Sequence, residues 1–213
     1  MRRFLIIVAF LLPFTACAGL IKSKITVFHE LPEAYPGTTY TTLPLKEQEG
    51  SLEHKTYEQL LKRELNAKGF HEVPLDQAEV VILLLYGIDT GREMVYSIPI
   101  LGQTGVSSST TLGTVQSYGS YGTYSGTTTY TPTYGIVGTA PVSQTQYTRF
   151  LKVDILDKRA LAQQRIKKLY EATVVSRGRT GNLSEVLPTM MKALFEEFPG
   201  ESGKARTSTR TNE

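Results

Sequence analysis

Two segments of the chain place apolar residues at the period of an amphipathic helix. In the first, Leu52, Tyr57, Leu61 and Leu65 recur near that period, and Ser51 is a favourable N-cap residue. The second has a stripe spaced i, i+3, i+4, i+7, i+8 and i+11, made of Leu187, Met190, Met191, Leu194, Phe195 and Phe198. We therefore predict one helix over about 52–68 and a second that begins at Asn182 or Ser184.

Short β-branched or alternating runs predict the strands. They cover residues 25–28, 38–43, 78–88, 147–156 and 169–175. The order is two strands, a helix, a strand, a long insertion, two strands and a helix. This order predicts an α+β fold with a mostly antiparallel sheet and two amphipathic helices on one face. A long Gly/Ser/Thr/Tyr-rich insertion would separate the central strands, and residues 200–213, which have no large apolar residue, are expected to be disordered.

The N-terminus has the pattern of a secretory signal. Arg2 and Arg3 precede an apolar run over 4–14, and small residues then precede Cys17. This arrangement resembles the lipobox of bacterial lipoproteins, which implies that Cys17 is lipidated and becomes the first residue of the mature chain. Ala18 after the cysteine resembles the class sorted to the outer membrane, with the domain facing the periplasm. Two alternatives remain open: the uncharged run over 4–21 could stay as an uncleaved anchor, or Cys17 could be an ordinary buried thiol.

The predicted organisation follows from these signals. Residues 1–16 form the signal peptide, 17–23 a lipid-anchored tether and 24–199 the α+β domain, within which 94–148 are the insertion; 200–213 form the tail. Removing Arg2 and Arg3 leaves 21 basic and 20 acidic side chains, so charge gives no reason to expect nucleic acid as a partner. A single cysteine excludes an intramolecular disulfide and a cysteine-cluster metal site.

The insertion is the most unusual segment. Residues 94–148 contain no Asp, Glu, Lys or Arg. Its candidate contact residues are tyrosines, namely Tyr118, Tyr121, Tyr124, Tyr130 and Tyr134, within a projecting segment of about 102–144. Three interpretations stay open: a flexible low-complexity loop, an extended β-hairpin that contacts a protein partner or a second copy, and a hairpin that inserts into a membrane as part of an oligomeric assembly.

Several short motifs occur in an order that suggests a family. They are Ser51-Leu52-Glu53 with Gly69-Phe70, Ala78-Glu79-Val80 leading to Leu85-Tyr86-Gly87, and Phe195-Glu196-Glu197-Phe198-Pro199. Together they resemble a Gram-negative lipoprotein family with a domain of unknown function. The family often has a tryptophan after its last hairpin turn, where this chain has Tyr170. The resemblance implies a small α+β envelope domain and brings no activity, cofactor or catalytic residue.

Local motifs predict no catalytic residue and no metal ligand. The histidines, His29, His54 and His71, have no metal-binding spacing, and no nucleophile or phosphate-loop motif occurs. We therefore expect a non-enzymatic, lipid-anchored envelope protein without a cofactor, which acts as a structural or protein-interaction module. The alternatives are an envelope hydrolase whose site is assembled from distant residues, or a subunit of an outer-membrane assembly that inserts β-hairpins.

Overall fold

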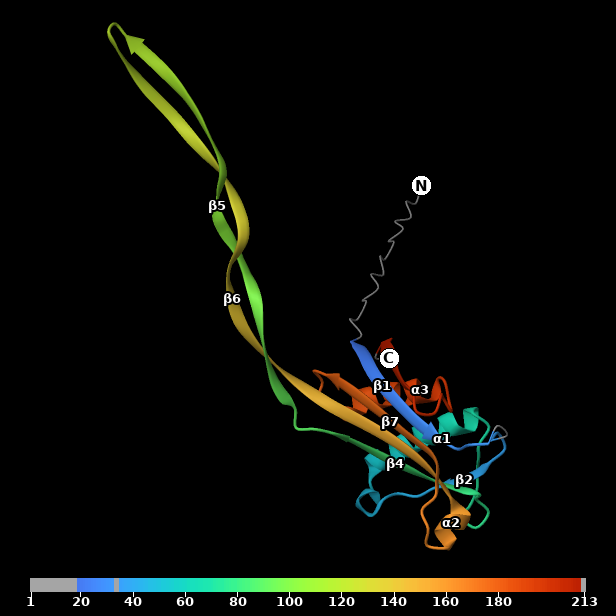
Figure 1. Ribbon diagram of the computed structural model, residues 1–213. Coiled ribbons are helices and arrows are strands. Elements are labelled where there is room, and N and C mark those ends of the chain that lie inside the picture. The colour runs from blue at the N-terminus through green and yellow to red at the C-terminus, as the bar shows by residue number, and fades with distance from the viewer. Residues whose placement is uncertain (1–18, 33–34, 212–213) are drawn as a thin grey trace, which may run out of the picture. The chain divides into compact units, whose positions relative to one another are not determined.

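The computed structural model describes residues 19–32 and 35–211 (Figure 1). The predicted signal peptide over 1–16 and the predicted lipidation residue Cys17 lie outside the described residues. The chain divides into two compact units. The core unit is the chain up to Gly91 together with the chain from Gln146 onward, and the hairpin unit is Arg92–Thr145.

One mixed sheet of eight strands organises the chain. The strands are β1 (Leu20–His29), β2 (Thr39–Thr42), β3 (His71–Glu72), β4 (Val80–Ile88), β5 (Arg92–Tyr118), β6 (Tyr121–Asp157), β7 (Lys168–Gly178) and β8 (Ala205–Thr211). Their order in the sheet is β3-β2-β4-β6-β7-β1-β8, and β5 pairs with β6. β2 runs parallel to both β3 and β4, whereas β4–β6, β6–β7, β7–β1 and β1–β8 are antiparallel.

The two long helices form where the hydrophobic pattern predicts them. They are α1 (Leu52–Ala67) and α3 (Leu183–Phe195); a short α2 (Lys158–Ala162) and the 3-10 turn η1 (Lys46–Gln48) complete the set. Ser51 Oγ accepts the amide of His54 at 3.1 Å, and Asn182 Oδ1 accepts the amide of Ser184 at 3.2 Å. These caps satisfy amides that have no partner within the helix.

The core lies between the sheet and helices α1 and α3. Alternate residues of four strands are buried, for example Ile25 in β1, Ile82 in β4 and Val174 in β7. They share one cluster with Leu61 of α1 and Met190 of α3, and Figure 1 shows both helices behind the sheet. Among the described residues, no helix is both long enough and apolar enough to cross a membrane.

The predicted fold class is wrong. Strands make up 56% of the structure and helices 19%, with three α-helices and one mixed sheet. Two physical reasons account for the error. The insertion forms long strands, and β2 enters the sheet through parallel pairings with segments about 30 and 40 residues away, which leave no local trace in the sequence.

Both predicted ends of the domain also need correction. Leu20–Ser23, expected to belong to the tether, form the start of β1 and pair with β8. The expected disordered tail over 200–213 contains β8. Backbone pairing with β1 orders this polar strand, and Arg206 Nη2 also donates to the carbonyls of Ala193 and Leu194 at 2.6 and 3.0 Å, at the end of α3.

Candidate functional site

The insertion is a two-stranded ribbon joined by a tight turn. β5 ends at Tyr118 and β6 begins at Tyr121, so only Gly119 and Ser120 connect them. Gly119 has φ 62°, the positive φ that the first central residue of a tight two-residue hairpin turn requires and that glycine adopts without strain. The structure contradicts the flexible loop, and the hairpin that it shows is common to the other two interpretations of the sequence.

Glycines in the ribbon make room for large side chains of the facing strand. A Cβ added to Gly113 would lie 2.5 Å from Tyr124 Oη, and one added to Gly102 would lie 2.8 Å from Val137 Cγ2. Threonine hydroxyls also face each other, with Thr111 Oγ1 2.9 Å from Thr128 Oγ1. The glycine-rich and threonine-rich composition therefore serves cross-strand packing, which composition alone does not distinguish from a flexible loop.

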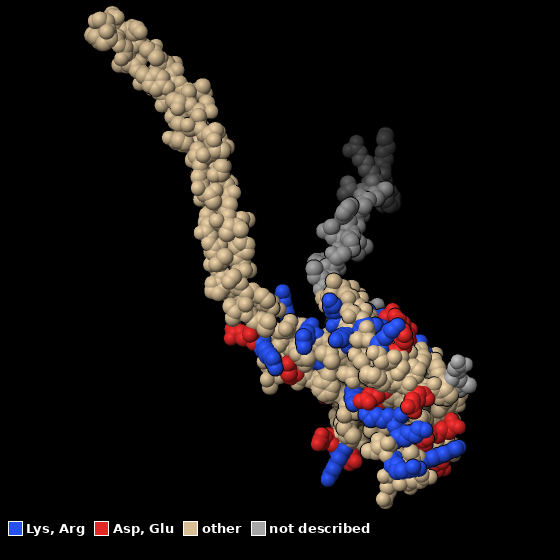
Figure 2. Space-filling view, in the orientation of Figure 1, with Lys and Arg blue, Asp and Glu red and all other residues tan. Residues whose placement is uncertain are grey.

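The large side chains of the hairpin unit lie open to solvent. The five candidate tyrosines are between 59% and 75% exposed. Figure 2 shows the long ribbon without Lys, Arg, Asp or Glu over most of its length, while both signs of charge are spread over the core unit. A ribbon of this kind has no interior in which to bury its own side chains.

The candidate tyrosines do not share one face. Because successive strand residues point to opposite sides, Tyr124, Tyr130 and Tyr134 occupy one face of β6. Tyr121 occupies the other face, together with Tyr118 across the tight turn. The contact set predicted from sequence is thus split into a turn pair and a three-tyrosine face.

The outer edges of the ribbon also lack partners in the described chain. β5 pairs with β6, and the other pairings of β6 involve residues from Tyr147 onward. Unpaired backbone amides and carbonyls at an edge can form hydrogen bonds with a strand of another chain. Proteins commonly prevent such pairing by placing charged side chains on the edge. Here only prolines such as Pro99 and Pro132 interrupt the uncharged edges. An isolated two-stranded ribbon is marginally stable in water, so this unit gains from a partner.

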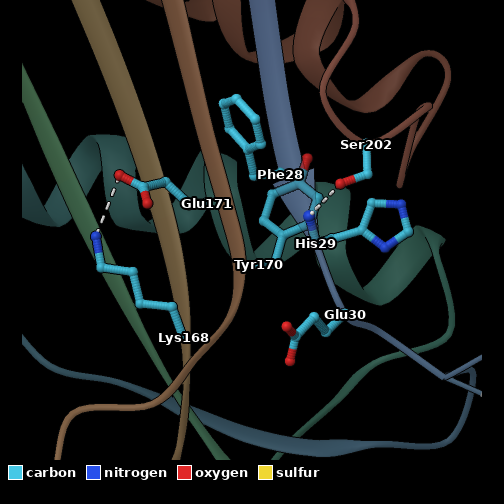
Figure 3. Close-up of a pocket in the computed structure, with 7 residues that line it drawn as sticks. All are labelled: Phe28, His29, Glu30, Lys168, Tyr170, Glu171 and Ser202. Carbon is cyan, nitrogen blue, oxygen red and sulfur yellow. Dashed lines mark hydrogen bonds and ion pairs between the residues drawn. The ribbon is translucent and has the colours of Figure 1, made fainter.

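A shallow pocket of about 300 Å³ lies beside the end of β1 (Figure 3). Ser202 Oγ accepts the backbone amide of His29 at 3.0 Å, and the imidazole Nε2 of His29 is 3.1 Å from the carbonyl oxygen of Gly200. Glu171 pairs with Lys152 at 2.6 Å and with Lys168 at 3.2 Å, and these two partners lower the pKa of Glu171. Ser202 and His29 are therefore engaged with the backbone, which is not the arrangement of a nucleophile and its base.

No group of three or more His, Cys, Asp or Glu side chains that could hold a metal gathers within residues 19–32 and 35–211.

Tyr170, which lines this pocket, carries a buried hydroxyl without a hydrogen-bond partner. Burial raises the pKa of Tyr170. Tyr170→Phe should therefore leave the melting temperature unchanged or raise it, because the variant removes an unpaired polar group and keeps the ring. Tyr40→Phe is the matched control: Tyr40 Oη donates to Asn66 Oδ1 at 3.1 Å, and its loss should cost about 1 kcal/mol. A larger loss for Tyr170→Phe than for Tyr40→Phe in thermal melting would contradict the assignment.

The solved structures that resemble this chain are only distantly similar to it in sequence and in fold. A PDZ domain protein from Parabacteroides distasonis is 13% identical with a TM-score of 0.48, over 90% of this chain and 38% of that chain. The PelC dodecamer from Paraburkholderia phytofirmans is 11% identical with a TM-score of 0.38, over 81% of this chain and 94% of that chain. No curated protein matches the sequence.

A family profile, by contrast, matches most of the chain. It is described as a domain of unknown function, DUF4136, and it covers residues 30–200. The matched range includes α1, the central strands, the hairpin unit and α3. The chain therefore belongs to the DUF4136 family.

Proposed function

We propose that this protein is a lipid-anchored protein of the Gram-negative cell envelope, whose hairpin unit is its protein-contact element. It is held in the outer membrane through Cys17, faces the periplasm and performs no catalysis. The observation that carries the contact role is the uncharged two-stranded ribbon with exposed tyrosines and two unpaired edges.

The anchor rests on the sequence signal and fits the position of β1. Arg2, Arg3, the apolar run and the small residues before Cys17 form the pattern of a lipoprotein signal. β1 begins at Leu20, three residues after Cys17. Three residues span at most about 10 Å, so lipidation at Cys17 would hold the start of β1 close to the membrane surface.

The contact role follows from what the ribbon lacks. It has no core of its own, and beyond Arg92 and Glu93 at its base it has no charges that would repel a similar strand. A partner that pairs with an edge satisfies backbone groups, and tyrosines offer large contact area with little loss of side-chain entropy. The partner is a second copy of this chain or another envelope protein.

Excising the outer ribbon tests the contact role. Gly102 and Val137 face each other, so residues 103–136 can be replaced by an Asn-Gly turn that joins them. The core cluster lies wholly outside the excised segment, so the melting temperature should stay within a few degrees of wild type. We expect the wild-type protein to form a complex in size-exclusion chromatography of mild detergent extracts, and the shortened protein to elute without it.

A second variant keeps the length of the ribbon. Tyr124, Tyr130 and Tyr134 are replaced together by Thr, and the matched control replaces the turn pair Tyr118 and Tyr121 by Thr. Loss of the complex in the first variant and retention in the control would assign contact to the three-tyrosine face; loss in both would include the turn pair. A complex of wild-type size in the shortened protein and in both tyrosine variants would contradict the contact role, as would failure of the shortened protein to fold.

A further inference from the structure

The first half of β1 presents two lysines on the face of the sheet that the helices leave uncovered. Successive strand residues point to opposite faces, and the burial of β1 alternates in this way. Ser23 and Ile25 are buried on the side of α1 and α3, which lie behind the sheet in Figure 1. Lys22 and Lys24 therefore point to the outer face, and both are exposed.

Strand pairing brings a third cation to the same face. Lys24 lies opposite Val175 of β7 on one side and opposite Thr207 of β8 on the other. Arg177 follows Val175 by two residues, so it shares the outer face, and it is exposed. Together with Lys22, these residues line an open groove of about 470 Å³. We call this set of five residues the basic face.

The three cations of the basic face have no acidic partner among residues 19–32 and 35–211. Elsewhere on the outer face, acidic side chains are matched by other lysines. Glu171 pairs with Lys152 at 2.6 Å, and Asp154 pairs with Lys168 at 3.0 Å. The basic face therefore has three positive charges that no described side chain neutralises.

Exposed apolar side chains border the basic face. Leu20 precedes Lys22 by two residues, so it lies on the same face of β1, and it is 71% exposed. Phe150 of β6 lies opposite Val175 and is 42% exposed. A surface that combines cations with exposed apolar groups suits the interface of an anionic membrane, where both contribute to binding.

The position of β1 in the chain gives a reason to choose a membrane as the occupant. Lys22 and Lys24 stand five and seven residues after Cys17, so they are at most about 18 and 25 Å from it along the chain. Electrostatic attraction falls off within about 10 Å at 0.1 M salt. A lipid on Cys17 would keep the basic face close enough to a membrane for this attraction to act.

We propose that the basic face lies against the anionic surface of the membrane that holds the anchor. Its three cations replace their missing counter-ions with phosphate groups of the lipid headgroups, through charge-assisted hydrogen bonds. Leu20 enters the boundary between the headgroups and the acyl chains. The choice of membrane rests on the proposed lipidation of Cys17, whereas the affinity of the face for an anionic bilayer rests on the core unit alone.

The single cysteine allows the tether to be built in vitro. Residues 17–213 are coupled through the Cys17 thiol to a maleimide phospholipid, in vesicles of phosphatidylcholine with or without phosphatidylglycerol. Mass spectrometry follows the acylation of each lysine by an amine-reactive ester. Phosphatidylglycerol should slow the modification of Lys22 and Lys24 about fivefold, since each basic residue near an anionic surface contributes about that factor.

Lys167 is the matched control in the same reaction. It is exposed and directly precedes β7, at the end of that strand opposite Arg177. Phosphatidylglycerol should change its rate of modification by no more than about twofold. Raising the salt to about 1 M, where screening acts within about 3 Å, should remove the protection of Lys22 and Lys24.

An untethered chain measures the affinity of the basic face. Residues 17–213 with Cys17→Ser are titrated with phosphatidylglycerol vesicles, and flotation gives the bound fraction. Replacing Lys22, Lys24 and Arg177 together by Gln should weaken binding about 100-fold, because three cations are lost. All three side chains are exposed, so the variant should melt like the parent chain.

The matched variant removes three positive charges elsewhere on the core unit. It replaces Arg159, Arg165 and Lys167 by Gln, and all three residues are exposed. Its binding to phosphatidylglycerol vesicles should stay within about twofold of the parent chain, although its net charge falls by the same amount.

Four results would overturn the proposal. Equal modification of Lys22 and Lys24 on both kinds of vesicle would mean that the face does not touch the membrane. Equal weakening by the two triple variants would mean that only net charge attracts the chain. Protection by inorganic phosphate, without any effect of phosphatidylglycerol, would assign the face to a free anion. Protection on neutral vesicles that grows with protein density would assign it to a second copy.

Failure of the anchor is read separately. Both vesicle experiments bypass lipidation in the cell, so they test the basic face whether or not Cys17 carries lipid there. Metabolic labelling with palmitate tests Cys17 itself. Labelling without protection of Lys22 and Lys24 would contradict the basic face and leave the anchor, and protection without labelling would contradict the anchor alone.

Discussion

Leu61→Asp should unfold the core unit at room temperature. Leu61 is fully buried between α1 and the sheet, in the same cluster as Ile82 and Met190. An unpaired carboxylate at this position costs several kcal/mol, either as a desolvated charge or as a neutral acid that has lost its hydrogen bonds to water. Because a domain of this size has a net stability of only about 5–15 kcal/mol, the variant should lose its cooperative thermal transition.

The same helix offers a matched control. Leu52 is the first residue of α1 and is 81% exposed. Leu52→Asp introduces the same chemical change where water still solvates the carboxylate and the helix N-terminus favours negative charge. Its free energy of unfolding should stay within about 0.5 kcal/mol of wild type. Equal melting of both variants by circular dichroism would show that α1 is not docked on the sheet as described.

Cys17→Ser should abolish lipid attachment and leave the protein with its signal peptide uncleaved. The lipidation that we propose at Cys17 rests on the signal pattern, and each methylene group that an acyl chain buries in the membrane contributes about 0.8 kcal/mol to binding. Several acyl chains on one cysteine therefore give lasting attachment, and their loss should abolish palmitate labelling and leave an unprocessed precursor. Ala18→Ser, which keeps the cysteine and a small neighbour, is the control and should be labelled like wild type. Equal labelling of the Cys17→Ser variant and wild type would remove the lipid anchor from the proposed function.

The hydrophobic period predicts the two long helices because their signals are local. Ser51 and Asn182 cap them as expected, and the apolar stripe from Leu187 to Phe195 is buried along α3. Gly69, just beyond α1, has φ 88°. A positive φ is common at the residue that follows a helix, and glycine is the residue that most often occupies that position. The residues that specify a helix are close together in the sequence, so a single sequence is sufficient to predict where the helix lies.

β8 could not be predicted because its order depends on distant residues. Its sequence is polar, and Ser208 is its one buried residue. Backbone hydrogen bonds to β1, about 180 residues earlier, hold it in place. The parallel pairing of β2 is equally non-local. A strand at a sheet edge can be polar on both faces, so hydrophobic alternation gives no signal there.

The candidate site shows the same division. The sequence alone shows that residues 94–148 have no charged side chains and that they contain the candidate tyrosines. The splitting of the tyrosines over two faces depends on where the turn falls, at Gly119. The burial of Arg149 could have been predicted, because Arg149, Leu151 and Val153 are spaced two residues apart and therefore point to the same face of the strand. Its hydrogen-bond partner Ser176 is placed opposite it only by the pairing of β6 with β7, which the sequence does not show.

The position of β1 between β7 and β8 sets the order in which the chain can fold. β1 precedes the other described strands along the chain, yet its two partners end at Gly178 and Thr211. Contacts of this sequence separation close late and slow the search for the native state. The nascent chain therefore carries β1 with one edge open until β7 has been made, and with the other edge open until β8 has been made. A chain that stops before Ala205 keeps one of these edges open, and we expect such a chain to aggregate unless a chaperone covers the open edge of β1.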